Sequence, residues 1–271
     1  AGAHLMLVDA PGHVDFSAEA ERTLAALDYA ILVVGANDGV QGHTETLWDL
    51  LARHEVPTFV FVNKCDLENP GREELLAELA SRLSPGCVDV SALLAGDAGA
   101  LEDTAATDEA ALEEYLETGS LSSGTLQRLV AERALFPVFF GAALRGDGVC
   151  ELLDGMCDLL AECSWSDELA ARVFRVSRGA RGERLAWVKV TGGTLRAKDQ
   201  LTGVDRRGEP WVEKINEVRL YQGESFETVA EVGTGRICAV TGLSHVVPGS
   251  ALGAEPEGAR PVLAPVLSYQ V

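Results

Sequence analysis

The sequence of 271 residues predicts an α/β domain with a parallel sheet, followed by a smaller all-β domain. In the first part, short apolar runs alternate with helical patterns of about 10–15 residues, which is typical of βαβ units. From residue 172 the apolar period changes to two, and glycines separate the short runs. Residues 1–171 carry 8 Lys and Arg against 31 Asp and Glu, whereas residues 172–271 carry 14 against 11. We therefore predict two domains, 1–171 and 172–258.

The elements of the first domain follow from its apolar patterns. The run Val56–Val62 is almost continuously apolar, as expected of a strand buried on both faces. The same criteria predict strands at Leu5–Val8, Tyr29–Val34, Val56–Val62 and Leu135–Phe140. Leucine spacing predicts helices at Phe16–Leu27, Thr44–His54, Arg72–Leu83 and from about Val149 to Leu160. Residues 97–117 contain eight acidic residues and no basic one, which predicts a solvated helical face and surface loop.

The second domain shows short strands at regular spacing. They are predicted at Arg172–Val176, Leu185–Thr191, Gln200–Val204, Ile215–Tyr221, Glu227–Val232 and Arg236–Val240. Turns are expected at Gly192-Gly193, Arg207-Gly208 and Gly223, and short strands at this spacing favour a small closed barrel. Residues 259–271 are expected to form a linker and the start of a further extended segment.

Composition excludes several classes of protein. No apolar run is long enough to span a membrane. The acidic first domain would be repelled by phosphates, which argues against DNA as a partner. The six cysteines form no C-x-x-C pair, which predicts reduced, mostly buried thiols in a cytoplasmic protein.

A candidate phosphate-side segment, Asp9-Ala10-Pro11-Gly12-His13, follows the first expected strand. A carboxylate at the carboxyl end of a parallel strand lies where an open α/β sheet binds its ligand. Beside a phosphate, such a carboxylate can orient water on Mg²⁺. Gly12 lets its N–H approach a phosphate, and His13 would lie near an attacking water. The segment alone is equally compatible with an Asp-Pro turn that opens a helix.

A second segment, Asn63-Lys64-Cys65-Asp66, follows the strand Val56–Val62. Asp66 can accept hydrogen bonds from guanine N1–H and the exocyclic amino group, a set of donors that adenine does not offer. Asn63 can bond the N7 side of the base, and the aliphatic stem of Lys64 can cover its face. Because this segment comes one βαβ unit after Asp9, chance is a poor explanation, and the pair indicates a GTPase.

Residues 1–171 resemble the latter part of the G domain of translational GTPases, in DAPGHVDF, ANDGVQ (Ala36–Gln41) and FVNKCD. The segments DGVQGHTETLW and LFPVFFGAALRGDGVCELLD are similar to elongation factor G and the tetracycline-resistance ribosomal protection proteins. GGTLRAKDQL matches the glycine-turn hairpin of the family's second domain, and Pro261–Val271 resembles the first strand of its third.

This resemblance implies an α/β P-loop GTPase-type parallel sheet, N-terminally truncated, followed by an all-β translation-factor barrel. It implies a GTP-hydrolysing factor that acts on the ribosome, with rRNA and ribosomal proteins as partners, and with GTP or GDP and Mg²⁺ as cofactors. Whether the parent is a translocase or a ribosomal protection protein stays open.

The resemblance also assigns the site residues. The third G motif is matched by Asp9, Ala10, Pro11, Gly12 and His13, in which Asp9 would hold the metal through water and His13 would be the catalytic residue that positions the attacking water. The fourth is matched by Asn63, Lys64, Cys65 and Asp66. The fifth is matched by Gly141, Ala142 and Ala143, where a backbone N–H meets the guanine oxygen.

Three positions depart from the family pattern. Ala10 replaces a usual Thr, Cys65 a usual aliphatic residue, and Ala142 a usual Ser. The loss of a loop-bracing hydroxyl at Ala142 is expected to have a modest effect, because the backbone N–H of Ala143 remains.

The sequence contains no G-x-x-x-x-G-K-[ST] phosphate loop, and the family's switch threonine is also missing. We therefore expect a GTPase parent but a catalytically incompetent chain; the alternative is a truncated module that binds a ribosome or partner without turnover. The strand before that loop would lie between Leu5–Val8 and Tyr29–Val34. Leu5–Val8 is thus expected to pair with Tyr29–Val34, to recruit a strand from a neighbouring molecule, or to be poorly ordered.

The first prediction concerns nucleotide binding by these 271 residues. Most of the affinity of such sites comes from phosphate and Mg²⁺ contacts, so the chain should bind GTP and GDP weakly and show negligible hydrolysis. Isothermal titration calorimetry measures the affinity, and a sub-micromolar dissociation constant for GDP would contradict the expectation.

Overall fold

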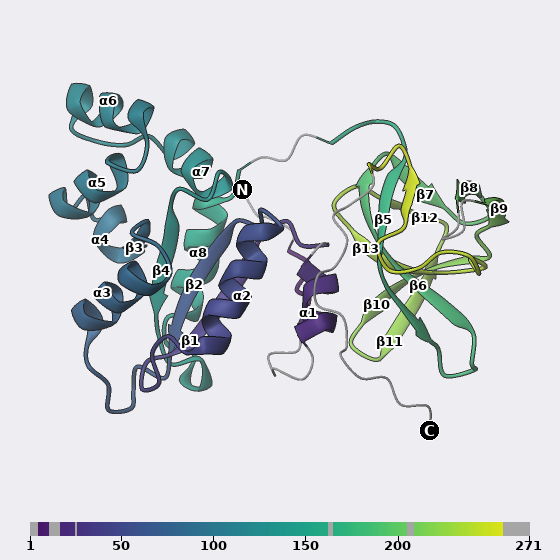
Figure 1. Cartoon of the computed structure of the whole chain (residues 1–271), viewed down its shortest axis with the longest axis horizontal. Helices are drawn as coiled ribbons and strands as arrows, with labels where there is room; N and C mark the ends of the chain where they lie inside the picture. The colour runs from purple at the N-terminus through teal and green to yellow at the C-terminus, as the bar shows by residue number, and fades with distance from the viewer. Residues whose placement is uncertain (1–4, 11–16, 25, 162–164, 205–208, 257–271) are drawn as a thin grey trace. The chain divides into compact units, whose positions relative to one another are not determined.

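The computed structural model describes residues 5–10, 17–24, 26–161, 165–204 and 209–256. The chain divides into two compact units (Figure 1). The first, here the sheet unit, contains the chain from Leu27 to Glu162. The second, here the β unit, contains His4–Ala26 and the chain from Cys163 onward. The expected linker and third-domain strand at 259–271 lie outside the described residues.

The sheet unit is built on four parallel strands in the order β1-β2-β4-β3. Their bounds are β1 Ala30–Gly35, β2 Thr58–Asn63, β3 Cys87–Asp89 and β4 Phe136–Phe140. In register, Val62 lies opposite Val34 on one side and Phe140 on the other. The carboxyl ends of β1, β2 and β4 therefore meet at one edge of the sheet, and their three following loops start side by side.

Helices cover both faces of this sheet. Along β2, Val60 and Val62 pack in one apolar cluster with Trp48 of α2 and Leu79 of α3, whereas Phe59 and Phe61 pack in another with side chains of α7 and α8. Since alternate residues of a strand point to opposite faces, these clusters are the two faces of one sheet (Figure 1). The helices are α2 Gly42–Arg53, α3 Arg72–Arg82, α4 Val90–Leu94, α5 Ala98–Ala105, α6 Glu109–Thr118, α7 Ser123–Ala131 and α8 Val149–Leu159, with a 3₁₀ turn, η2, at Ala143–Arg145.

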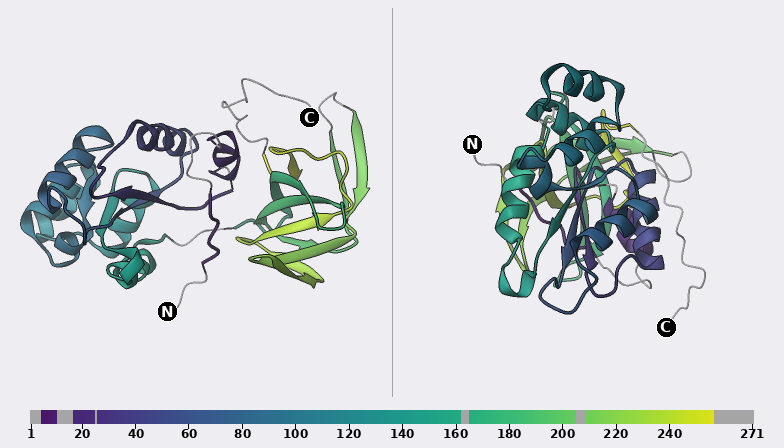
Figure 2. Two further views of the ribbon diagram at one scale, coloured as in Figure 1. Left: turned by 90° about the horizontal axis from the view of Figure 1, so that it is seen from below. Right: turned by 90° about the vertical axis from the view of Figure 1, so that its left-hand side faces the viewer.

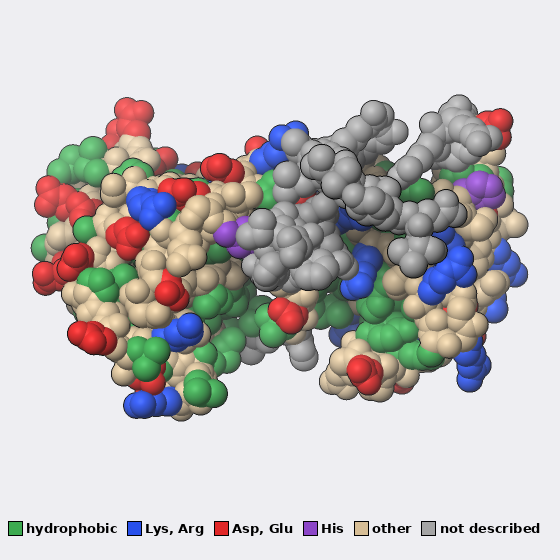
Figure 3. Space-filling view, turned by 60° about the horizontal axis from the view of Figure 1, so that its bottom comes forward, with side chains coloured by type: hydrophobic (Ala, Val, Ile, Leu, Met, Phe, Trp, Pro, Cys, Tyr) green, Lys and Arg blue, Asp and Glu red, His purple; other side chains and the backbone are tan. Residues whose placement is uncertain are grey.

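The acidic stretch 97–117 forms α5 and α6, as expected. Asp97 and Asp108 cap these helices by accepting from Ala100 N at 3.0 Å and Ala111 N at 2.9 Å. Ala111 is buried, whereas the glutamates of α6 are mostly exposed. Figure 3 shows acidic side chains over the sheet unit and more basic ones over the β unit, in agreement with the charge step near residue 172.

The β unit is antiparallel throughout its described strand pairs. Six strands follow the order β11-β10-β13-β6-β5-β14, and two ribbons, β12-β7 and β8-β9, complete the unit around one apolar core (Figure 2). The strands are β5 Ala170–Arg178, β6 Arg184–Gly192, β7 Thr194–Arg196, β8 Gln200–Val204, β9 Pro210–Lys214, β10 Glu217–Gln222, β11 Ser225–Val229, β12 Glu231–Gly233, β13 Ile237–Thr241 and β14 Ala251–Gly253.

The expectation of a strand at Leu5–Val8 is wrong. Residues 5–10 form neither helix nor strand, and Leu7 is 87% exposed. Met6 Sδ instead accepts a hydrogen bond from Ile237 N at 3.2 Å, and Val8 packs against a small cluster that includes Ile237. The segment therefore belongs to the β unit and does not pair with β1. Helix α1, Ser17–Leu24, lies in the same unit against β5.

The described cysteines differ in burial, and Cys65 is half-buried. Cys87 and Cys238 are buried, and burial raises the pKa of each thiol to about 12, which keeps them protonated and unreactive. Cys150 and Cys157 are exposed on α8, so the expectation of mostly buried thiols is wrong for these two. No helix in the described ranges is long and apolar enough to cross a membrane.

The second prediction uses two helical glycines to test the packing of α8 on the sheet. A Cβ at Gly155 would lie 2.7 Å from the ring of Phe139, whereas one at Gly124 of α7 would meet nothing within 4 Å. Both Gly→Ala changes gain helix propensity, so Gly124→Ala should stabilise by about 0.5–1 kcal/mol. Gly155→Ala should destabilise by about 1–3 kcal/mol because of overpacking. Urea denaturation measures both, and equal stabilisation by the two changes would contradict this packing.

Candidate functional site

Two loops leave the same edge of the sheet from neighbouring strands. The Asn63 loop, residues 63–69, follows β2, and the Gly141 loop, residues 141–148, follows β4. Gly141 N donates to Val62 O at 2.9 Å, and Cys65 N donates to Gly141 O at 3.0 Å. The ladder between β2 and β4 thus continues into the loops, and it brings the fourth-motif and fifth-motif residues together.

Asn63 joins the two loops through one side-chain oxygen. Its Oδ1 accepts from Lys64 N at 2.8 Å and from Ala143 N at 2.9 Å. Both hydrogen bonds use the amide oxygen, so the Nδ2 donor is not engaged by them. The N–H of Ala143, expected from the family to face the guanine oxygen, is therefore held by Asn63 in this structure. A contact with the base would require that this hydrogen bond be shared or exchanged.

The Asn63 loop is closed by its own backbone. Lys64 has φ of 65°, a left-handed conformation that costs a residue with a side chain about 1–3 kcal/mol. The turn is stabilised by Leu67 N donating to Lys64 O at 3.1 Å and by Asn69 Nδ2 donating to Leu67 O at 2.7 Å. Lys64 is exposed at the start of this turn, so its stem is available to a flat ligand.

Glycine is required at both ends of the Gly141 loop. A Cβ on Gly141 would lie 2.2 Å from Asp147 O, and one on Gly148, at φ of 77°, would lie 2.4 Å from Phe140 O. Between them, Ala142 N donates to Asp147 O at 3.0 Å, and Arg145 N donates to Ala142 O at 2.9 Å. The backbone therefore braces this loop, so the hydroxyl absent at Ala142 is not needed for its shape.

The carboxylate of Asp66 forms an ion pair with the Gly141 loop. Arg145 Nε lies 3.0 Å from Asp66 Oδ2, and the side chains are 64% and 22% exposed, respectively. Sequence reasoning did not single out Arg145. Its only sequence signal is its place two positions after the fifth motif. The pairing with Asp66 could not be predicted from this, because it arises only when the fold brings the two loops together.

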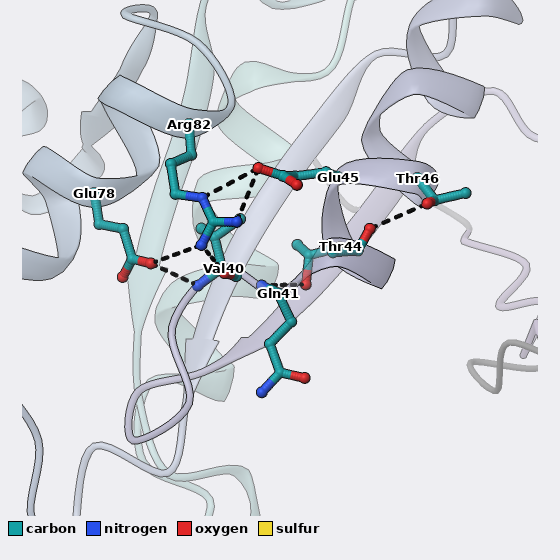
Figure 4. Close-up of polar contacts among 8 residues, drawn as sticks. Val40, Gln41, Thr44, Glu45, Thr46, Glu78 and Arg82 are labelled. Carbon is teal, nitrogen blue, oxygen red and sulfur yellow. Dashed lines mark hydrogen bonds and ion pairs between the residues drawn. The ribbon is translucent and has the colours of Figure 1, made fainter.

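A third loop, Ala36–Gln41, follows β1 and contacts both the Asn63 loop and α3. Figure 4 shows its contacts with Glu78 and Arg82 of α3. Ala36 N donates to Asn63 O at 2.7 Å, and Val40 N donates to Glu78 Oε1 at 3.0 Å. Arg82 binds the backbone oxygen of Val40 and pairs with Glu45 at 2.9 Å. The hydrogen bond with Glu45 is the main reason that the pKa of Arg82 is raised.

The two described residues of the third motif, Asp9 and Ala10, lie in the other compact unit. Asp9 is exposed and Ala10 is half-buried on the coil segment 5–10 of the β unit. Pro11, Gly12 and His13 lie outside the described residues. An exposed carboxylate at Asp9 is compatible with a hydrogen bond to a metal-bound water. Within the described ranges, no group of three or more His, Cys, Asp or Glu side chains could hold a metal ion directly.

Two protein families match successive parts of the chain. Residues 1–162 match the elongation factor Tu GTP binding domain, and residues 168–252 match elongation factor G domain 2. The boundary between the matches agrees with the change of pattern and charge near residue 172.

Curated relatives share this pair of domains over most of the chain. The oxytetracycline resistance protein of Streptomyces rimosus is 34% identical over 278 residues, which covers 91% of this chain and 42% of the relative. The tetracycline resistance protein TetM of Streptomyces lividans is 30% identical over 98% of this chain and 45% of its own length. Elongation factor G of Mycoplasma pneumoniae is 26% identical over 92% of this chain and 45% of its own length. The chain thus spans less than half the length of these relatives.

A solved structure supports the fold. A crystal structure of a protein from Thermus thermophilus superposes with a TM-score of 0.76 at 24% identity, over 93% of this chain and 44% of that one. This likeness concerns the arrangement of the chain and not its chemistry.

The third prediction tests the role of Asn63 as the tie between loops. Asn63→Ala removes the acceptor of the Lys64 and Ala143 amides, so hydrogen exchange at Ala143 N should accelerate by about tenfold, the equivalent of ~1.4 kcal/mol. NMR-detected exchange measures this rate. The matched control is Asn37→Ala, which removes a side-chain amide that donates to Asp38 Oδ1 at 3.0 Å in the loop after β1, and it should leave Ala143 unaffected. Unchanged Ala143 exchange in Asn63→Ala would show that the loops are held otherwise.

Proposed function

Because the chain belongs to the translational GTPase family, we propose that it is part of a protein that binds and hydrolyses GTP and acts on the ribosome. Its partners would be rRNA and ribosomal proteins, and its place of action the cytoplasm. The relatives with the higher identities are tetracycline resistance proteins, which favours a ribosomal protection role over translocation.

The observation that carries this proposal is the joined pair of loops at the carboxyl edge of the sheet. Asp66 presents a partly exposed carboxylate, which suits two neighbouring N–H donors such as guanine N1–H and the exocyclic amino group. Asn63 is held by its oxygen, and its Nδ2 group, which these two hydrogen bonds do not use, could donate to N7. Exposed Lys64 can cover one face of the base. Together these groups would select guanine.

The hydrolytic part of the proposal rests on the third motif. Water would attack the γ-phosphate in line, with His13 positioning the water and Asp9 contacting a water on Mg²⁺. The metal would neutralise charge that develops on the phosphate oxygens. Gly12 would bring its N–H close to the γ-phosphate, an approach that a side chain at this position would hinder.

The fourth prediction tests base selection by Asp66. Asp66→Asn exchanges an acceptor for a donor, so in the full-length protein the preference for guanine over xanthine nucleotides should fall by at least about tenfold, and xanthine nucleotides should bind better than in the wild type. Competition binding with GDP and XDP measures the ratio. Asp147→Asn is the matched control, because its side chain is exposed in the adjacent loop while only its backbone braces that loop. An unaltered GDP to XDP ratio in Asp66→Asn would remove Asp66 from guanine recognition.

A further inference from the structure

The ion pair between Asp66 and Arg145 involves the carboxylate that the proposed function assigns to guanine. Arg145 Nε is 3.0 Å from Oδ2, which is hydrogen-bonding distance for a charge-assisted pair. One of the two oxygens that guanine would need is therefore already engaged by a side chain of the protein.

The backbone on both sides of this pair is fixed. Arg145 ends the 3₁₀ turn η2, whose next residue, Gly146, has φ of 83° and donates to Ala143 O at 3.1 Å. Asp66 lies in the turn closed between Lys64 and Leu67. Asn63 Oδ1 holds the two loops to one another. The guanidinium is thus presented to Asp66 by the architecture of the loops, while its 64% exposure leaves it room to move aside.

The two oxygens of Asp66 respond differently to different bases. Guanine offers two donors on one edge, N1–H and the exocyclic amino group, and uses both oxygens. Hypoxanthine offers N1–H but has no exocyclic amino group, so one oxygen is sufficient for it. The second hydrogen bond of guanine uses Oδ2, where the base competes with the guanidinium of Arg145 for space and for one of the two acceptor positions of that oxygen, whereas hypoxanthine can bind through Oδ1 with Arg145 in place.

We propose that Arg145 is a specificity-determining residue that competes with the exocyclic amino group of guanine for Asp66 Oδ2, and so lowers the preference of the site for guanine over hypoxanthine nucleotides. This inference rests on the proposed function, since it takes Asp66 as the guanine acceptor. Arg145 satisfies the carboxylate before the base binds, and in the guanine complex it turns towards solvent.

The test is Arg145→Met in the full-length protein, which keeps an unbranched side chain and removes the donors. Competition binding gives dissociation constants for GDP and IDP. An exposed ion pair contributes about 0.2–1 kcal/mol, so GDP should bind about 1.4- to fivefold more tightly, while IDP should change little. The ratio of the two constants therefore rises by about the same factor. Raising the salt concentration should increase the GDP preference of the wild type but not that of Arg145→Met, because salt screens the competing pair.

Arg72→Met is the matched control. Arg72 is a similarly exposed arginine of the sheet unit that lies 3.7 Å from another aspartate, Asp89. The substitution Arg72→Met removes the same charge without affecting a contact of Asp66, and it should leave the GDP to IDP ratio unchanged.

The outcomes separate this inference from the proposed function. If Asp66→Asn shifts the protein towards xanthine but Arg145→Met leaves the GDP to IDP ratio unchanged, or weakens GDP binding, the competition is refuted and the GTPase proposal stands. If Asp66→Asn has no effect, or the wild type binds neither nucleotide, the proposed function fails and this inference fails with it.

Discussion

The geometry of the candidate guanine site depends on the side-chain oxygen of Asn63. Parallel pairing of β2 with β4 brings their following loops to one edge, and the hydrogen bond from Cys65 N to Gly141 O carries that pairing into the start of the loops, but backbone pairing does not reach Ala143. Asn63 Oδ1 supplies the constraint there, because it accepts from one amide in each loop. The approach of Arg145 to Asp66 is a consequence, since both residues are positioned by the loops that this oxygen joins.

Much of the fold was predictable because burial is encoded locally. The runs at β1, β2 and β4 are apolar on both faces, and the leucine spacing of α2, α3 and α8 reports a single buried side. The short β3, α4, β7, β9 and β14 were missed, because three to five residues carry too little periodicity, and the nine-residue α7 was missed as well. Leu5–Val8 was predicted as a strand and is not one. Four consecutive apolar residues satisfy the local pattern of a strand. A strand also requires a hydrogen-bonding partner, and a local pattern does not tell whether the fold supplies one.

The site was predictable to the extent that it is written in contiguous motifs. Asn63 and Asp66 were identified from one tetrapeptide, and the structure places Gly141 and Ala143 beside them. The residues that support or compete with these groups were not identified. Arg145, Glu78 and Arg82 act through contacts with loops distant in sequence, and an arginine or glutamate on a helical face has the same pattern whether it is solvated or paired.

The departures from the family motif at Ala142 and Cys65 are explained by the main-chain hydrogen bonds of the two loops. Ala142 lacks a hydroxyl, yet its N–H donates to Asp147 O and its carbonyl accepts from Arg145 N. Cys65 donates its thiol to Val62 O at 3.3 Å and its N–H to Gly141 O. Main-chain hydrogen bonds therefore set the path of both loops at these positions, and side chains there can vary. The positions that cannot vary freely are those where a side-chain atom makes the contact, as at Asn63, or where no side chain fits, as at Gly141. In the proposed guanine site, selection of the base would then depend on few atoms, so one competing arginine beside Asp66 would be enough to alter it.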